Sequence, residues 1–255
     1  MGRWNPLEGV YEMPVQQKDR WATLVNKMGD DLTVVNAARV SFNKYVDYET
    51  DEYGFSSASI TEHSRTKYPK VPRLRKGDEK LIKYLAKHGH WSPFSHCSAQ
   101  FHIKAPVFVA RQLVKHQVGL AWNEVSRRYV DEEPTFYEPK EWRLAAKNKK
   151  QGSSDETIKY SIEPAYRFAR ECYANMLNLG IAPEMARMVL PQSMMTEWYW
   201  SGSLYAFARV CNLRCKSDAQ KETRLVCEDI SDQIEQLFPV SWKYLTEERQ
   251  IVATS

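Results

Sequence analysis

The sequence predicts an α+β fold: one mixed domain, rich in helix, with a central antiparallel or mixed sheet. Apolar residues recur at helical spacing in several segments, most clearly over residues 161–179. Elsewhere apolar and polar side chains alternate as in a half-buried strand, for example where Phe101 and Ile103 have polar neighbours. Internal repeats and a clear domain boundary are both absent from the sequence. We therefore expect a single domain over residues 1–255, with its core over 21–238.

The same patterns place the individual elements. We expect strands over 21–29, 92–106 and 123–131, and helices over 31–42, 77–90, 107–117, 161–179, 183–190, 202–214 and from 217 onward. Ser217, with Gln220 three residues later, has the pattern of a capping box that opens the last helix. Residues 1–20 are expected to be an irregular lead-in and 147–157 an exposed loop. Residues 43–77 fit either a long surface loop or a flexible insertion.

The composition is that of an ordinary globular protein. The net charge of +4 is compatible with an anionic small substrate but does not indicate binding of polymeric nucleic acid. No apolar run reaches the roughly 18 residues that a membrane helix needs, and the first residues lack the apolar stretch of a signal peptide. We therefore expect a cytoplasmic protein with no membrane partner. The five cysteines, an odd number, are expected to be reduced thiols.

Familiar catalytic and cofactor motifs are missing from the sequence. It contains no Walker-type phosphate loop, no GxGxxG after a strand and no GxSxG elbow. His88, His90 and His96 are close in sequence but have no accompanying carboxylate, so we expect structural roles and no metal site. A nucleotide or flavin bound here would not use a standard dinucleotide fold.

Polar side chains are concentrated between Gln112 and Arg128. If 123–129 is a strand, Glu124, Ser126 and Arg128 project from one face. An acceptor, a hydroxyl and a guanidinium on one face can orient a planar polar ring or bind a phosphate. A solvated strand face is the alternative interpretation.

Two further arginines lie among apolar residues. Arg187 is found in PEMARMVLP and Arg214 in VCNLRC, and such positions are costly for an arginine unless an anion meets it. Convergence of Arg128, Arg187 and Arg214 would suit a nucleotide monophosphate. Arg187 could instead lie on the exposed side of an amphipathic helix.

Taken together, these segments resemble the flavin-dependent thymidylate synthase family. The matching segments, in the family's order, are AARVSF (37–42), KHGHWSPFSH (87–96), FHIKAPVFVARQ (101–112), NEVSRRY (123–129), EMARMVLP (184–191) and NLRCKSDAQ (212–220). The resemblance implies conversion of dUMP to dTMP, with 5,10-methylenetetrahydrofolate as carbon donor and NADPH-reduced FAD as hydride source. It also implies a homotetramer with active sites between subunits.

The resemblance assigns roles residue by residue. The residues that resemble the dUMP-binding set are Gln112, Glu124, Ser126, Arg127, Arg128, Arg187 and Arg214. Arg214 resembles the catalytic arginine that stabilises ionised uracil at N3. The residues that fall where the family holds FAD are His90, Ser92, Lys115, His116, Gln117, Glu124, Ser203, Tyr205 and Arg209. Because Ser126 has no His–Asp arrangement beside it in the sequence, its expected role is binding.

The departures from the family pattern lie on the flavin side. The family signature is Arg-His-Arg, seven residues and Ser, whereas this chain has Lys115-His116-Gln117, eight residues and Ser126. The extra residue falls within VGLAW and must loop out. Ser203 and Tyr205 replace a common Asn and Arg, Arg209 replaces an Asn, and Asp218 replaces a His. Two alternatives remain open. One is flavin-dependent alkylation of another pyrimidine nucleotide, by a dCMP methyl- or hydroxymethyltransferase; the other is a non-catalytic nucleotide-binding relative, which the departures on the flavin side favour.

Overall fold

The centre of the molecule is a four-stranded antiparallel sheet with strand order β3-β4-β8-β5. The computed structural model describes residues 3–5, 10–12, 21–48, 74–129, 132–146 and 153–246. The sheet strands are β3 (Ala22–Met28), β4 (Ser98–Pro106), β5 (Leu120–Glu124) and β8 (Met195–Ser203). This confirms the predicted α+β class and makes the central sheet purely antiparallel.

Strands β4 and β8 form the middle of the sheet and pair along their whole length, from Ser98 opposite Ser203 to Pro106 opposite Met195. Alternate residues of both strands are buried, as the period of a strand requires. Trp198 and Trp200 of β8 are almost fully buried, and the Trp200 ring lies 5.4 Å from that of Phe207. The two tryptophans of β8 therefore belong to the core, whereas Tyr199 between them is half-buried.

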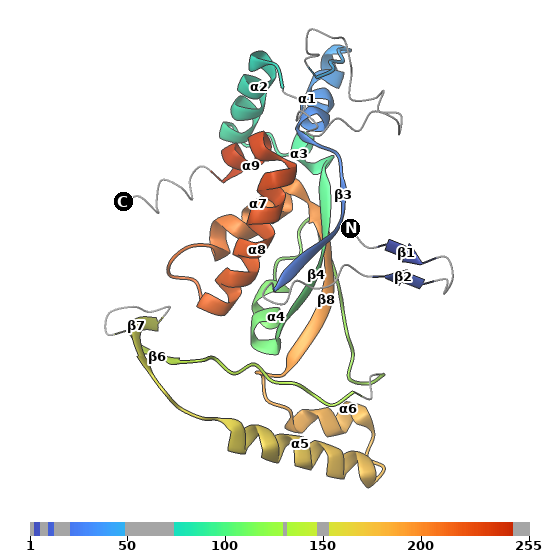
Figure 1. Ribbon diagram of the computed structural model, residues 1–255. Helices are drawn as coiled ribbons and strands as arrows, with labels where there is room; N and C mark the ends of the chain where they lie inside the picture. Colours follow the sequence, from blue (N-terminus) through green and yellow to red (C-terminus); the bar gives the residue numbers. More distant parts are fainter. Residues whose placement is uncertain are drawn as a thin grey trace.

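Helices lie beside this sheet and at the two ends of the molecule (Figure 1). They are α1 (Asp31–Arg39), α2 (Lys76–Lys87), α3 (Ser92–Ser95), α4 (Val107–Leu113), α5 (Glu163–Asn178), α6 (Pro183–Ala186), α7 (Leu204–Arg214), α8 (Lys221–Leu237) and α9 (Pro239–Leu245), with 3-10 turns η1 (Val40–Phe42) and η3 (Arg187–Val189). Figure 1 shows α4, α7 and α8 beside the sheet. Helices α1, α2 and α9 gather at one end of the molecule, and α5 and α6 at the other.

Two short hairpins lie outside the central sheet. Strands β1 (Arg3–Asn5) and β2 (Val10–Glu12) pair within the stretch that was expected to be irregular. Strand β7 (Ser153–Ile158) pairs with β6 (Trp142–Ala145), so the expectation of a loop over 147–157 is wrong for its second half. Of the 43–77 stretch, residues 49–73 lie outside the described part.

Two predicted element starts and one predicted helix need correction. Residues 92–95 form helix α3 rather than strand, since Pro93 in its first turn has the backbone angle that a helix start needs. Helix α8 begins at Lys221, and the side chain of Gln220 caps nothing, so the predicted capping box from Ser217 is wrong. The helix expected over 183–190 is split into α6 and η3.

An ion pair fixes the first turn of α8. The Arg143 guanidinium of β6 donates to both carboxylate oxygens of Glu222, at 2.8 and 3.0 Å. Burial alone would raise the pKa of Glu222, but hydrogen bonds and charge from Arg143 hold it below its ordinary value. Glu222 therefore stays ionised in the fold and ties β6 to the start of α8.

Candidate nucleotide site

Gln112 lies in the last turn of α4 and is held from both ends of its amide. Its Nε2 donates to Oε1 of Gln220, and its Oε1 accepts from Oγ1 of Thr223 at 3.2 Å. Gln220 in turn donates to Glu222 at 3.2 Å. The predicted binding residue Gln112 is therefore oriented by the first turn of α8.

His116 and Arg214 form the most specific polar contact among the predicted residues. Arg214 ends α7, and its Nε donates to Nε2 of His116 at 3.0 Å. Burial first, and then the positive charges of Arg214 and Arg209, lower the pKa of His116 below its ordinary value. His116 is therefore neutral, with Nε2 as acceptor and the proton on Nδ1. This bond orients the Arg214 guanidinium through Nε and does not engage its two terminal nitrogens.

This contact predicts a pH dependence. Because the pKa of His116 is lowered below its ordinary value, its acceptor is intact near neutral pH and is lost as the pH falls through that lowered pKa. We expect kcat/KM for dUMP to fall on this acid side. His116→Gln offers an amide acceptor that does not titrate, so its pH profile should lack the acid limb. An identical limb in wild type and variant would contradict the assignment.

Glu124 is the last residue of β5, and its carboxylate is held by two neighbours. Oε1 accepts from Oγ1 of Thr196 at 2.8 Å, and Oε2 accepts from Nε1 of Trp122 at 3.2 Å. The Trp122 ring stacks on Trp198 at 4.4 Å, which fixes the indole donor on the sheet. Glu124 is thus a pre-oriented acceptor at the exposed edge of β5.

The chain leaves the sheet directly after Glu124, so the prediction of a strand over 123–131 is wrong for residues 125–129, while residues 130 and 131 lie outside the described part. The amide of Val125 still donates to Glu197 O at 2.9 Å, but Ser126 then starts a turn. Its Oγ accepts from the Arg128 amide at 3.4 Å, and its carbonyl accepts from the Tyr129 amide at 3.0 Å. A serine that bonds its own local backbone competes with the sheet ladder. The predicted shared strand face of Glu124, Ser126 and Arg128 therefore does not form.

Arg128 and Arg187 meet at one glutamate. Arg128 Nε lies 3.8 Å from Oε2 of Glu184, and Arg187 Nε donates to the Glu184 carbonyl at 3.3 Å. Both arginines are exposed. The neighbouring Arg127 points elsewhere and donates to the carbonyl of Glu132. The structure thus brings two of the three predicted arginines together, while Arg214 lies with His116.

The remaining residues that the resemblance assigns to the flavin lie in two separate places in the fold. Ser203 caps α7, since its Oγ accepts from the Ala206 amide at 3.2 Å, and its own amide donates to Gly119 O at 3.2 Å. The other residues of this place are Tyr205 and Arg209 of α7 and Lys115 and Gln117 after α4. The second place is the link between α2 and α3, where His90 and Ser92 are exposed.

Four neighbours of the predicted residues were not expected from the sequence as site residues. They are Gln220 and Thr223 beside Gln112, Thr196 beside Glu124, and Glu184 beside Arg128. Gln220 and Glu184 fall inside the family-like segments NLRCKSDAQ and EMARMVLP, which is the one signal that could have identified them. Thr196 and Thr223 carried no such signal.

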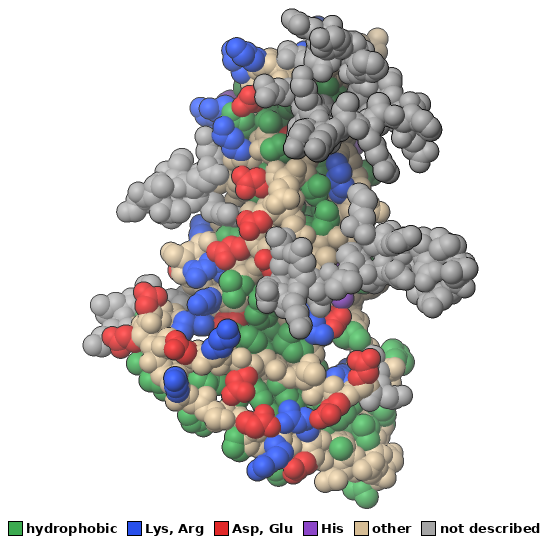
Figure 2. All heavy atoms as spheres, viewed as in Figure 1, with side chains coloured by type: hydrophobic (Ala, Val, Ile, Leu, Met, Phe, Trp, Pro, Cys, Tyr) green, Lys and Arg blue, Asp and Glu red, His purple; other side chains and the backbone are tan. Residues whose placement is uncertain are grey.

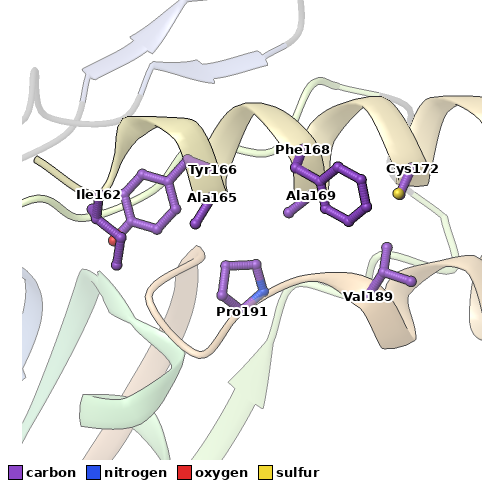
Figure 3. Close-up of a pocket in the computed structure, with 8 residues that line it drawn as sticks. All are labelled: Ile162, Ala165, Tyr166, Phe168, Ala169, Cys172, Val189 and Pro191. Carbon is purple, nitrogen blue, oxygen red and sulfur yellow. The ribbon is translucent and has the colours of Figure 1, made fainter.

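An apolar cavity of about 260 Å³ lies between α5 and the η3 turn, which begins at Arg187. Figure 3 shows Tyr166 and Phe168 of α5 opposite Val189 and Pro191. Its lining offers almost no hydrogen-bonding group for a nucleotide. The polar groups of α4, β5 and α7 are therefore the better candidate site.

Fold and site together define a class: an α+β protein whose oriented amides, carboxylates and arginines suit an anionic planar ligand. Within the described part of the chain, no helix is long and apolar enough to cross a membrane. The family model described as thymidylate synthase complementing protein matches residues 23–240.

Named relatives agree with this match. The chain is 35% identical to the flavin-dependent thymidylate synthase of Thermus thermophilus, covering 92% of this chain and 78% of that one. It is 36% identical to the synthase of Kosmotoga olearia, covering 86% and 87%. It also resembles the solved UMP/dUMP methylase PolB of Streptomyces cacaoi bound with 5-Br dUMP, with 29% identity, a TM-score of 0.69 and coverage of 89% and 94%. The chain belongs to the flavin-dependent thymidylate synthase family.

Proposed function

We propose that this protein methylates dUMP to dTMP, with methylenetetrahydrofolate as carbon donor and NADPH as reductant of a bound FAD. The observation that carries the proposal is the Arg214–His116 bond, which orients a guanidinium without using its terminal nitrogens. Forming a nucleophile at C5 of uracil without a cysteine requires fixed positive charge beside the anion that develops on the ring. In this proposal Arg214 supplies that charge at N3.

The other polar groups bind the nucleotide. Gln112 and Glu124 are held by neighbours, so they can meet the uracil and sugar with little loss of side-chain freedom. Arg128 and Arg187, at the exposed surface, bind the phosphate by charge-assisted hydrogen bonds. Ser126 and Arg127, in the turn after β5, also bind the nucleotide in this proposal. The choice of uracil follows from N3, because cytosine has no N3 proton whose loss Arg214 could stabilise.

The residues around α7 fit a flavin. Neutral His116 and the hydroxyl of Tyr205 can hydrogen-bond a ring edge, and Lys115 and Arg209 are exposed cations that suit a pyrophosphate. The further groups that would hold the flavin are Gln117, Ser203, His90 and Ser92. When bound, the flavin supplies the hydride. Arg209 places a cation where the family commonly has an asparagine, so the charge absent at Gln117 is carried by the neighbouring helix.

The proposal includes a homotetramer in which two subunits complete each site, a single domain over the chain, and a cytoplasmic location. Support for the shared site comes from the arrangement of the candidate residues. His90 and Ser92 lie at the link between α2 and α3, whereas Arg128 and Arg187 lie near α6 at the far end of the sheet (Figure 1). Sites built between subunits would bring such separated groups together.

Two observations on the purified protein test this function. A yellow protein whose flavin absorbance bleaches with NADPH is expected, and so is dTMP as the product when dUMP and methylenetetrahydrofolate are added. UMP and dCMP are assayed beside dUMP, since the solved relative PolB is a UMP/dUMP methylase. A colourless protein that binds dUMP without turnover would instead support the non-catalytic alternative.

A further inference from the structure

One face of helix α2 is uniformly cationic. Its exposed charged residues are Lys76, Lys80, Lys83 and Lys87. Their spacing of four, three and four residues places them along one side of the helix. Figure 2 shows Lys and Arg side chains at this end of the molecule, where α2 lies in Figure 1. The stripe, here called the α2 lysine face, extends for about 18 Å because each helical residue rises 1.5 Å.

The two acidic residues of α2 do not neutralise this face. Asp78 is buried and paired with Arg39. Glu79 accepts a hydrogen bond from the Tyr244 hydroxyl at 2.9 Å, on the side that packs against α9. Both carboxylates are thus engaged by other groups, and within the described residues no carboxylate forms an ion pair with these lysines. Lys83 also lies over the Tyr244 ring, with its Nζ 5.3 Å from the ring centroid.

The C-terminal end of the α2 lysine face adjoins the flavin-side residue His90. The exposed Tyr84 ring lies 4.3 Å from the His88 ring and 5.9 Å from the His90 ring. These rings offer flat surfaces for an aromatic group. A ligand whose ring end lies near His90 would therefore meet Lys87 first if it extended along α2.

The N-terminal end of the face leads to a cavity of about 480 Å³ between α1, η1 and α2. Its lining combines apolar and cationic side chains: Ala38, Arg39, Phe42, Lys44, Gly77, Lys80 and Leu81. Within the described residues, the buried Nε of Arg39 has no hydrogen-bond partner. The amides of Asp78 and Glu79 in the first turn of α2 already donate to the Arg75 carbonyl, so the cationic side chains of the lining are the groups that favour an anion here. The cavity is thus suited to carboxylates at the end of a flexible chain.

We propose that the α2 lysine face and this cavity bind the γ-linked glutamyl chain of the folate cosubstrate. This rests on the proposed function. A folate carries a ring system at one end and one carboxylate more for each added glutamyl residue at the other. The ring end lies on the flavin side near His90, and the glutamyl carboxylates extend past Lys87 to Lys80. Affinity for the carbon donor therefore rises with the length of its glutamyl chain.

The test compares monoglutamyl and polyglutamyl methylenetetrahydrofolate with the full-length enzyme. Lys80→Ala/Lys87→Ala should raise KM for the polyglutamyl form about fivefold, since each exposed ion pair contributes little alone. KM for the monoglutamyl form, for dUMP and for NADPH should stay unchanged. The matched control is Lys140→Ala/Lys159→Ala, which removes two exposed lysines elsewhere and should leave both folate forms unaffected.

Several outcomes would overturn the proposal. Equal KM increases for both folate forms would indicate that the lysines contact the ring end of the folate or contribute to folding. A raised KM for NADPH would assign the face to dinucleotide phosphates. Unchanged KM for the polyglutamyl form would remove the site altogether. In each of these cases, turnover of the monoglutamyl form by the wild type would still support the proposed function. Failure of the glutamyl-chain proposal can therefore be distinguished from failure of the proposed function.

Discussion

Arg214→Ala should reduce kcat by about 10²–10³-fold while weakening dUMP binding only about tenfold. The guanidinium is held by its Nε against neutral His116 at 3.0 Å, so its terminal nitrogens are positioned before substrate arrives. Such a fixed donor acts mainly on the charge that develops at N3 in the transition state. Single-turnover kinetics and equilibrium dUMP binding measure the two effects separately.

Two further variants sharpen this test. Arg214→Lys keeps the charge but lacks the Nε donor that meets His116, so it should recover only part of the lost rate. Arg187→Ala removes an exposed arginine that we assign to the phosphate. It should raise KM for dUMP and leave kcat nearly unchanged. If Arg187→Ala lowered kcat as strongly as Arg214→Ala, the division between activation and binding would be wrong.

Trp200→Ala should lower the free energy of unfolding by about 3–5 kcal/mol. The side chain of Trp200 in β8 is fully buried. The centroid of its ring lies 5.7 Å from that of Trp122 and 5.4 Å from that of Phe207. Removing it leaves a cavity between the sheet and α7, the helix that ends at Arg214. Chemical denaturation measures the loss.

A milder variant and a surface control accompany it. Trp200→Phe keeps most of the ring and removes an indole N–H that is buried without a partner in the described part of the chain. It should cost much less than alanine. Tyr45→Ala removes an aromatic ring that is 73% exposed and should change stability by no more than about 0.5 kcal/mol. Equal losses for Trp200→Ala and Tyr45→Ala would contradict this account of the core.

The sequence predicts those elements whose pattern is local. Helix α5 lies within the expected 161–179 span, because its apolar stripe and the stop at Gly180 are properties of that segment alone. The strand predicted from residue 92 begins at Ser98, because the alternation around Phe101 and Ile103 does not show where the strand starts. The helix predicted from Ser217 begins at Lys221, because the spacing of Ser217 and Gln220 resembles a capping box that does not form. Beyond Glu124 the turn formed by Ser126 replaces the expected strand. Alternation of residue types cannot show whether the backbone bonds to a neighbouring strand or within a local turn.

The site is predictable only in part, because its contacts are distant in sequence. Arg214 is 98 positions from His116, and Gln112 is 108 positions from Gln220. A resemblance can assign each residue to a substrate or a cofactor, but it does not give these pairings. They arise from the packing of α4, α7 and α8 beside the sheet. The neutral state of His116 likewise follows from that packing, since burial and two arginines cause it.

The most direct test of the central claim is tritium release from dUMP labelled at C5. With FAD, NADPH and methylenetetrahydrofolate present, the wild-type protein should release tritium to water in proportion to the dTMP formed. Arg214→Ala, loaded with dUMP and flavin, should release almost none. Absence of release by the wild type under these reducing conditions would contradict the account.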